Sequence, residues 1–542
     1  MRRYLIGTIS ALLVACSQSG GSDPSSDSER SPPPPGTPQD NATAPPPVEG
    51  TAAPDGVFVS TSLGDDSGGG TRERPFKTLK KAVQVAQQQQ VRVLACAETY
   101  AENLEVVDGV SIYGYFDCRK PGWDRVRAKA VIDAPSSPAV LANGITRATR
   151  IEGFEVRAPD MDGAPATDST GTSIALEVRG SKNLALGEVL IHAGKGAPGT
   201  DGADGPMNAR MNASSDGAKG EEETSRSCPQ PAIPISVCQF SRYVPGFPGG
   251  ATTCAIVPNG GAGGAGGDPR HYALLEAVTE SAAGPPYDWR GRPLAASAAT
   301  AVGGTNSAND GYGTGRPGAD GAGGEEGTDG VNGLWSLTTA GFARGNGTAG
   351  GAGGSGQGGG GGGSPRWFYT PLGTATRNLP GNADYYQTAA GGGGGAGGCA
   401  GQPGTPATGG GASIGALVID SSVNFERSRV ESSNGGRGGQ GNLGTPGIAG
   451  GKGGAQIARG LLTIAGKGGD GGEGGNGGAS GHGAPGPSIA LVYSGTRPTL
   501  TSTDLAPGPA GAGQPALKRA TTNGEKVLPA IDGASKPEHE IK

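Results

Sequence analysis

The apolar positions between residues 56 and 195 predict one helix followed by a series of short strands. Apolar residues between 76 and 86 recur at helical spacing with lysines on the opposite side, which predicts an amphipathic helix over residues 75–90. No second helical pattern follows, so the chain is expected to be all-β, either a sandwich or a solenoid. The strand-like runs alternate with polar residues and end at turn residues; they cover residues 91–95, 104–107, 110–113, 130–132, 139–141, 151–156, 174–178 and 184–191.

A repeated sequence decides between these two architectures. The run SIALEVRGSKNLALGEVLIHAGKG at Ser173 returns as SIGALVIDSSVNFERSRVESSNGG at Ser413 and as SIALVYSGTRPTLTSTDLAPG at Ser488, with a weaker echo from Ala139. A unit of about 20 to 25 residues cannot bury its inner face alone, so it must stack on its neighbours. The repeat therefore predicts a solenoid of stacked coils, with the helix capping the first coil.

Between and beside these coils, glycine falls on every third residue in seven tracts. A three-residue period is the pitch of the polyproline II helix, and glycine at every third position leaves one ridge of that helix bare. Adjacent bare ridges would let backbone N–H and C=O groups bond laterally, which predicts a polyglycine II bundle whose other residues face water. The tracts cover residues 196–205, 260–266, 315–333, 347–362, 392–404, 435–453 and 466–481.

Two alternatives to the bundle stay open at this level. A single glycine tract makes no internal hydrogen bonds and loses much backbone entropy on ordering, so isolated tracts would stay disordered. Collagen shares the period but needs three chains, long unbroken runs and more proline than GRPGADGAGGEEGTDG contains.

Composition excludes one class of function and points away from a large aromatic core. Of 542 residues, 108 are Gly and 43 are Pro, whereas aromatic residues make up only 5%. The formal net charge is −6, and no cluster of Lys and Arg alternates with aromatic residues. A nucleic-acid partner is therefore not expected.

The first residues have the organisation of an export signal. Arg2 and Arg3 precede an apolar run over residues 4–15, which is too short to span a bilayer. The residues LVAC that end at Cys16 resemble a bacterial lipobox, which implies cleavage after residue 15 and lipid attachment to Cys16. The resemblance implies a membrane partner through the lipid, on the outer membrane or cell surface. Residues 16–55, dense in Pro and Ser, are expected to form a disordered tether.

The remaining cysteines suit an exported protein with three disulfides. We expect Cys96 to pair with Cys118, whereas the sequence leaves the pairing of the other four open. Metal ligation is the competing hypothesis, but no C-x-x-C pair occurs and the four histidines are scattered, so no metal or other cofactor is expected. The six candidates are Cys96, Cys118, Cys228, Cys238, Cys254 and Cys399.

The start of the folded part carries a resemblance to a known superfamily. The stretch VFVSTSLGDDSGGGTRERPFKTLKKAVQVA resembles the beginning of bacterial right-handed parallel β-helix proteins of the pectin-lyase-like superfamily, over about 100 to 140 residues. That superfamily includes polysaccharide lyases, glycoside hydrolases and adhesins, so the resemblance implies a fold rather than an activity. The glycine tracts also look like those of mycobacterial polymorphic-repeat proteins and similar myxobacterial lipoproteins.

The chain therefore divides into six expected segments. A signal peptide and a tether come first, and β-helix coils are interrupted by insertions and glycine tracts. The segments are a signal peptide (1–15), a tether (16–55), the N-terminal β-helix portion (56–195), glycine-rich and Cys-containing insertions (196–412), coils alternating with glycine tracts (413–506) and a disordered tail (507–542).

Candidate catalytic residues are few and have ordinary structural explanations. β-Helix enzymes that cleave acidic sugars use carboxylates with Arg or Lys on one face, but no spacing here fixes such a pair. Several of the aspartates border glycine turns, where Asp bonds its own backbone. His192 ends a strand and is expected at the surface. The candidates are Asp65, Asp66, Asp108, Asp117, Asp124, Asp133 and Arg150.

The sequence favours a non-catalytic surface lipoprotein that serves as a structural or adhesive display element and contacts polysaccharide. The first alternative is a carbohydrate-active β-helix enzyme, which requires acidic and basic side chains clustered on one outer groove of the coils. The second is binding to ice or another ordered solid, which the charged residues Lys467, Asp470 and Glu473 within the last tract oppose.

Overall fold

The computed structural model divides the chain into two units, Met1–Pro45 and Pro46–Lys542. The expectations for the signal peptide, Cys16, the tether, Cys228 and Cys238 fall outside the residues that the structure describes. Those described residues are 56–120, 123–162, 171–210, 216–219, 247–256, 259–266, 316–363, 391–456, 458–459, 463–521 and 524–542.

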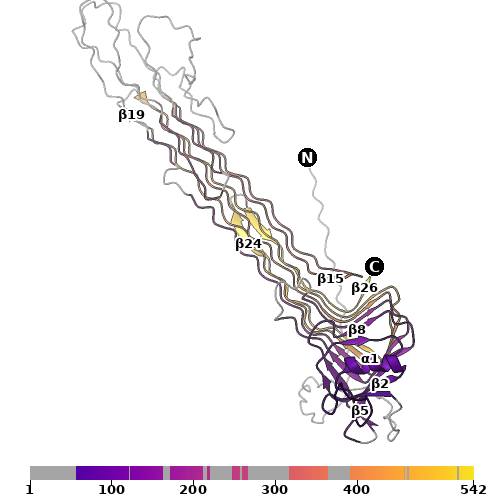
Figure 1. The fold of residues 1–542 in the computed structure, drawn as a ribbon. Helices are drawn as coiled ribbons and strands as arrows, with labels where there is room; N and C mark the ends of the chain where they lie inside the picture. Colours follow the sequence, from indigo (N-terminus) through magenta and orange to yellow (C-terminus); the bar gives the residue numbers. More distant parts are fainter. Residues whose placement is uncertain are drawn as a thin grey trace, which may run out of the picture. The chain divides into compact units, whose positions relative to one another are not determined.

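Three sheets of mainly parallel strands make up most of the regular secondary structure (Figure 1). The first contains β1 (Gly56–Val59), β2 (Arg92–Cys96), β5 (Ile112–Asp117), β9 (Thr149–Glu152), β12 (Leu184–Gly187), β17 (Val423–Glu426) and β22 (Thr499–Thr501), with β6 (Asp124–Arg125) antiparallel to β5. The second contains β3 (Thr99–Tyr100), β7 (Ala130–Asp133), β10 (Phe154–Arg157), β13 (Leu190–His192), β18 (Arg429–Glu431) and β23 (Asp504–Ala506). The third contains β4 (Leu104–Val106), β8 (Val140–Asn143), β11 (Ser173–Arg179), β16 (Ser413–Ile419), β21 (Ser488–Ser494) and β26 (Ser535–Ile541).

The sequence repeats stack on one another in register, as predicted. Ser173 pairs with Ser413, and Ser413 pairs with Ser488, so the first residue of each repeat lies directly above the next. Each repeat then supplies one strand to the first sheet and one to the second. This order of stacked parallel strands is β-helix-like, and it excludes the sandwich.

Four successive coils, those that contain β9, β12, β17 and β22, turn from the first sheet to the second at a residue with left-handed backbone conformation. The expected strands 151–156 and 184–191 are therefore each split in two, at Gly153 (φ 74°) and Glu188 (φ 49°). Arg427 (φ 46°) and Ser502 (φ 49°) occupy the same corner in the next two coils, because each follows the last paired residue of the first-sheet strand. Non-glycine residues adopt this conformation at a cost of about 1–2 kcal/mol, so the stacking of the coils must stabilise it.

The single helix of the described residues, α1 (Leu79–Gln89), packs its apolar face into the core that the sheets enclose. Thr78 caps its N-terminus by accepting a hydrogen bond from the Lys81 amide, and Glu102 accepts bonds from the first amides of the helix. The predicted amphipathic helix is therefore confirmed, although it starts four residues later than the sequence pattern indicated. Its buried residues are Leu79, Ala82, Val83 and Ala86.

The glycine tracts are joined by lateral backbone hydrogen bonds that recur every three residues. From Gly318 to Gly333, every third amide donates to the tract that contains residues 467–482, at 2.7–2.9 Å. The carbonyls of the tract 316–333 in turn accept hydrogen bonds from amides of a third tract, for example the Ala319 carbonyl from the Gly360 amide at 2.8 Å. Figure 1 shows these segments running side by side. We call residues 194–205, 259–266, 316–333, 345–363, 391–411, 434–454 and 465–487 the glycine bundle.

Within this bundle, glycine at every third position is a steric requirement. A Cβ atom on Gly321 would lie 1.9 Å from the Gln357 carbonyl oxygen, and one on Gly472 would lie 2.0 Å from that of Ala322. Both positions are far inside van der Waals contact with backbone atoms, which cannot move aside as a flexible side chain can. The lateral hydrogen bonds that the bundle hypothesis predicted are present in the described tracts. These tracts are ordered against one another, so the alternative of isolated, disordered tracts does not describe them.

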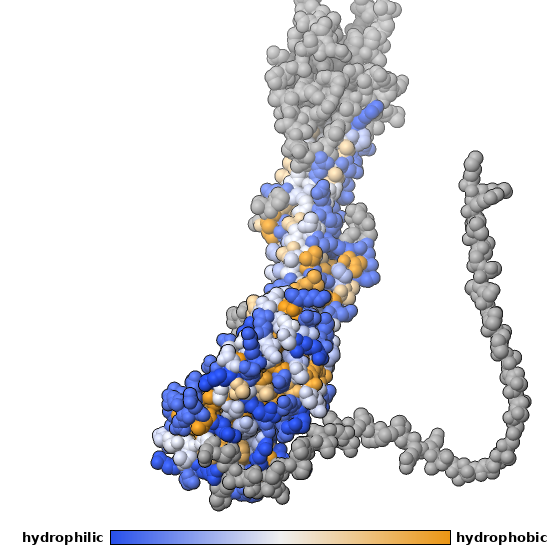
Figure 2. Space-filling view, turned by 90° about the vertical axis from the view of Figure 1, so that its right-hand side faces the viewer, coloured by the Kyte–Doolittle hydropathy of each residue, from blue (hydrophilic) through white to orange (hydrophobic). Residues whose placement is uncertain are grey.

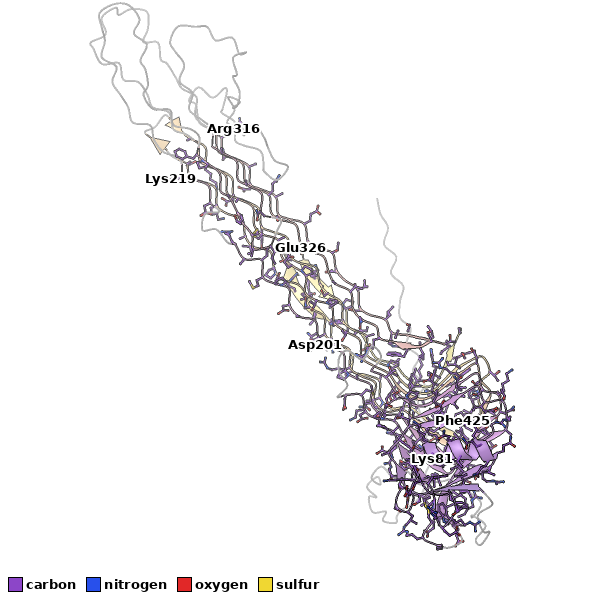
Figure 3. All side chains as sticks on the ribbon, viewed as in Figure 1. Lys81, Asp201, Lys219, Arg316, Glu326 and Phe425 are labelled. Atoms are coloured by element: carbon purple, nitrogen blue, oxygen red, sulfur yellow. A yellow bond between two sulfur atoms is a disulfide. The ribbon has the colours of Figure 1, made fainter. Side chains whose placement is uncertain are left out.

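Side chains between the glycines also link neighbouring tracts, which the sequence analysis did not predict. Asp320, Asp329 and Asn332 each accept a hydrogen bond at 2.7–2.9 Å from an amide of the tract 465–487. Asp470, which was expected only to face water, accepts a bond from the Gly453 amide and pairs with Lys452 at 2.9 Å. Figure 3 shows side chains such as Glu326 projecting from the bundle.

His482 also departs from the expectation that such side chains face water. The residue is fully buried, and its Nδ1 accepts a hydrogen bond from the Gly441 amide at 2.9 Å. Burial is the cause that lowers the pKa of His482.

The segment 507–542 was expected to be disordered, and its described residues show that this was wrong. β26 pairs with β21, and a hairpin of β24 (Leu517–Thr521) and β25 (Gly524–Leu528) contacts the glycine bundle. Arg519 donates to the Gly444 carbonyl at 2.8 Å, and Lys526 pairs with Asp329 at 2.9 Å. The order comes from backbone pairing and from bonds to bundle carbonyls, neither of which requires the apolar pattern that sequence analysis looks for.

We predict that Gly472→Ala destabilises the bundle by about 1–3 kcal/mol, because its methyl group would collide with the Ala322 carbonyl. Circular dichroism melts of the full chain measure the effect. Glu473→Ala is the matched control, since Glu473 is exposed and adjacent, and it should change stability by less than about 0.5 kcal/mol. Equal melting temperatures for the two variants would contradict the steric requirement.

A second prediction concerns the loss of stability at acidic pH. The pKa of His482 is lowered in the folded state, so its contribution to stability is complete above the unfolded pKa of about 6.5 and is lost as the pH falls below it. The melting temperature should therefore drop between pH 7.5 and pH 5, and His482→Gln should reduce that drop. His192→Gln is the control, because the pKa of His192 is raised. An unchanged acid response in His482→Gln would refute the prediction.

Candidate functional site

Two disulfides lie within the described residues. Cys96 pairs with Cys118, as predicted, and Cys254 pairs with Cys399 across a Cα–Cα distance of 5.8 Å. The second pair joins residues 247–256 to the glycine bundle, a pairing that the sequence left open. The first bond closes a loop between residues 22 apart in the sequence, and the second joins residues 145 apart.

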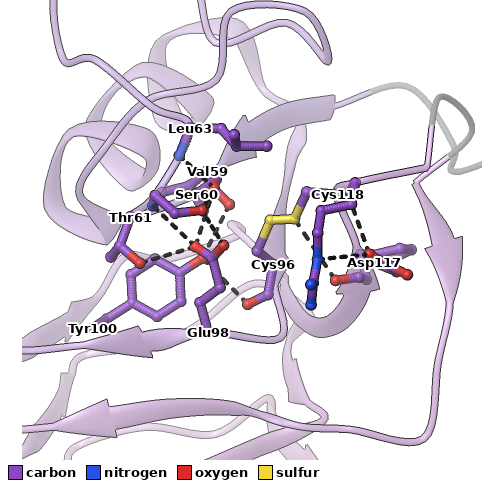
Figure 4. Close-up of a disulfide and its surroundings, with 12 residues drawn as sticks. Val59, Ser60, Thr61, Leu63, Cys96, Glu98, Tyr100, Asp117 and Cys118 are labelled. Atoms are coloured by element: carbon purple, nitrogen blue, oxygen red, sulfur yellow. Dashed lines mark hydrogen bonds and ion pairs between the residues drawn. A yellow bond between two sulfur atoms is a disulfide. The ribbon is translucent and has the colours of Figure 1, made fainter.

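The Cys96–Cys118 disulfide lies beside a carboxylate that organises the first turn of the fold (Figure 4). Glu98 accepts hydrogen bonds from Ser60 at 3.0 Å, from Thr61 at 2.9 Å and from Ser62. Burial alone would raise the pKa of Glu98, but these hydrogen bonds outweigh it, so the pKa is lowered.

Ligand atoms of Cys96, Glu98 and Cys118 lie within 4.8 Å of one another, which is a grouping that a metal could use. The two sulfurs are instead joined in the disulfide, and the carboxylate is held by hydroxyl groups. Among the described residues this grouping therefore locks the turn that follows β1, rather than offering a metal centre.

A charged cluster occupies the outer face of the first sheet. The Arg150 guanidinium contacts the Glu152 carboxylate and lies 2.9 Å from that of Glu426, two coils further along. Glu152 also pairs with Arg125 at 2.8 Å and accepts a hydrogen bond from the Tyr115 hydroxyl. Arg125 in turn lies 3.9 Å above the Tyr115 ring, as in a cation–π contact. We call Tyr115, Arg125, Arg150, Glu152 and Glu426 the Arg150 cluster.

Of the seven candidates named from the sequence, the structure brings only Arg150 into this cluster. Asp65 accepts a hydrogen bond from the Ser67 amide of its own turn, and Asp66 accepts one from the Lys77 amide just before α1. Asp117 and Asp124 form partly exposed ion pairs. Asp133 ends β7 and is exposed. These aspartates are therefore not gathered into a common site.

Asp108 is also a structural residue. It accepts hydrogen bonds from the amides of Arg147 at 2.7 Å and of Thr146 at 2.8 Å. These bonds, with the Arg147 amide as the largest cause, lower the pKa of Asp108 to about 2. The side chain thus ties two turns of adjacent coils together.

Glu152 and Glu426 were missed by the sequence analysis, although the signal was present. In the paired register, Glu152 aligns with Gly187 and Gly187 with Glu426, so the repeat carries glutamate at one equivalent outward position in alternate coils. Aligning the repeats over their second strands, and not only their first, would have placed both carboxylates on one face.

His192 lies at the surface of the second sheet, as expected, and it is not isolated. Its Nδ1 is 3.2 Å from Glu431 in the next coil. The hydrogen bond to Glu431 raises the pKa of His192.

Within the described residues, no helix is long and apolar enough to cross a membrane.

Comparisons with known proteins add little to this picture. No family model matches the chain, and no curated protein does. Among solved structures, a GH136 lacto-N-biosidase from Eubacterium ramulus is similar over 25% of this chain and 26% of its own, with 14% sequence identity and a TM-score of 0.10. The chain thus spans about a quarter of that enzyme, and the likeness carries no argument about fold or activity.

Proposed function

We propose that this chain is an exported, lipid-anchored surface protein that acts as a non-catalytic display or adhesive element. The observation that carries the proposal is the lateral hydrogen bonding of the glycine bundle, which converts a composition typical of linkers into an ordered structural element. Bonds such as that from the Gly196 amide to the Asn434 carbonyl continue this order up to the coils.

The proposal includes a finer account of the fold. The stacked coils form a right-handed parallel β-helix, and α1 caps its first coil, where it packs against β1, β2 and β4. The glycine tracts adopt polyglycine II conformation, which explains why their lateral bonds recur every three residues. Cys16 carries the lipid, and residues 16–55 form the tether that lets the coils and bundle reach polysaccharide outside the membrane.

Solid-surface binding, the second alternative, gains no support from the bundle. Glycines such as Gly327 and Gly478 are directed at neighbouring backbones, so they do not present a bare face to a solid. In the face shown in Figure 2, hydrophilic and hydrophobic residues are mixed over the surface, with paler residues of intermediate hydropathy along the bundle. A regular apolar surface is not visible on that face.

Lipid anchoring is tested by Cys16→Ser in the full chain, expressed in a bacterial host and followed by cell fractionation. The wild-type chain should be recovered with membranes, and the variant should move to the soluble exported fraction, because it lacks the acyl chains that hold the protein to the bilayer. Ser19→Ala is the matched control and should remain with membranes. Retention of Cys16→Ser with membranes would refute the anchor.

One observation favours the carbohydrate-active enzyme as a second candidate. The Arg150 cluster is the gathering of acidic and basic side chains on one outer face that this alternative requires. Glycoside hydrolysis needs two carboxylates that flank a bond, and Glu152 and Glu426 are held by one guanidinium. We favour the structural role for the cluster because these carboxylates are neutralised by Arg125 and Arg150.

The two candidates separate in an assay for reducing and unsaturated sugar ends, with polygalacturonate and xylan as probes. Our proposal predicts no release above background from either polymer by the wild-type chain. Release that Glu152→Gln abolishes, while the control Glu155→Gln on the second sheet preserves it, would establish the enzyme and overturn the non-catalytic role.

A further inference from the structure

A cleft on the outer face of the third sheet belongs to neither the Arg150 cluster nor the glycine bundle. A hairpin of β14 (Ser336–Thr338) and β15 (Gly341–Ala343) covers part of this face. Under it, β16 and β21 are buried along their whole length. β11, the strand before them, keeps Glu177 and Arg179 partly exposed on the same face. The outer face of the third sheet is thus fully covered over β16 and β21 and only partly covered over β11.

The cleft lies where the hairpin-covered part of the sheet meets β11, and it has a volume of about 640 Å³. Ile174, Leu417 and Phe342 give it apolar walls, while Asp160, Glu177 and Arg179 supply its charged groups. Pockets that bind small ligands have this size and this combination of apolar surface with a few polar groups.

Glu177 and Arg179 stand side by side on β11, two residues apart, and are joined through Arg179 Nε and Glu177 Oε1. Arg179 Nη1 also donates to the Thr339 carbonyl at 2.6 Å, which holds the pair against the hairpin. Within the described part of the chain, no hydrogen bond is found for Arg179 Nη2 or Glu177 Oε2. The pair therefore offers one fixed donor and one fixed acceptor at the cleft.

We propose that this cleft binds a neutral saccharide. A guanidinium beside a carboxylate can donate to one hydroxyl of a sugar ring and accept from the next, and the fixed geometry reduces the entropy lost on binding. The apolar walls suit the C–H faces of the ring. Arg179 is paired with Glu177, and Asp160 is paired with Lys195 at 3.1 Å, so the cationic groups at the cleft are already neutralised. A uronic acid would therefore find no unpaired cation among these described residues, which favours a neutral sugar.

This inference deepens the polysaccharide contact of the proposed function and rests on it, since it names the class of sugar and its place on the coils. It differs from the enzyme alternative in location, because the Arg150 cluster is on the first sheet and the cleft is on the third.

Isothermal titration of the full chain with cellotetraose, maltotetraose and tetragalacturonate tests the proposal. We expect at least one neutral tetrasaccharide to bind and tetragalacturonate not to bind. Glu177→Gln should weaken neutral binding at least tenfold, because it removes the charged acceptor while keeping the side-chain shape. Glu155→Gln is the matched control: Glu155 forms the same kind of pair with Arg157, two residues away on β10, outside the cleft.

Three results would overturn the inference: no binding of either neutral probe, equal affinities for the wild type and Glu177→Gln, or tighter binding of tetragalacturonate. A circular dichroism melt of Glu177→Gln distinguishes lost binding from lost folding. If that variant melts at a lower temperature than the wild type, it is replaced by Arg179→Lys, which keeps the positive charge but not the planar, forked donors of the guanidinium. Titration in solution does not depend on anchoring, so failure here leaves the Cys16→Ser result intact.

Discussion

The constraint on which the rest of the structure depends is the lateral hydrogen bonding of backbones that lie too close together for any side chain. In the glycine bundle, a Cβ atom at a tract glycine such as Gly475 would lie 1.9 Å from a neighbouring carbonyl oxygen. This closeness lets amides and carbonyls of separate tracts satisfy one another. Glycine loses more backbone entropy on ordering than other residues, and only the accumulation of such bonds offsets that loss.

The coils explain how tracts so far apart in sequence meet in the correct phase. Ser173, Ser413 and Ser488 stack in register. The tracts that end just before Ser413 and Ser488, and those that follow each repeat, therefore leave the coils at fixed positions. Bonds at this junction follow the same order, from Gly436 to the Gly411 carbonyl and from Gly486 to that of Gly436. The serine hydroxyls join the two parts directly, since Ser413 donates to the Gly194 carbonyl at 2.7 Å.

Sequence reasoning recovered the parts of this fold that depend on periodicity. The helix, the stacked repeats, the phased glycines and the Cys96–Cys118 pair all leave local signals. It failed where order depends on contacts made elsewhere: β26 lacks an apolar pattern and is held by pairing with β21. Likewise, the continuous apolar run of β16 marks a strand covered on both faces, but only the structure shows that Phe342 lies in the cluster above it. The Arg150 cluster was partly missed because its members come from different coils.

The central claim is that the glycine tracts form an ordered bundle in solution, and a distance measurement between spin labels tests it most directly. Labels at Arg316→Cys and Leu334→Cys, both exposed positions, bracket one tract of the full chain. At a polyglycine II rise of about 3.1 Å per residue, the labels should give one narrow distribution near about 55 Å. A broad distribution centred near about 20–25 Å, as expected for a flexible glycine-rich chain of this length, would contradict the account.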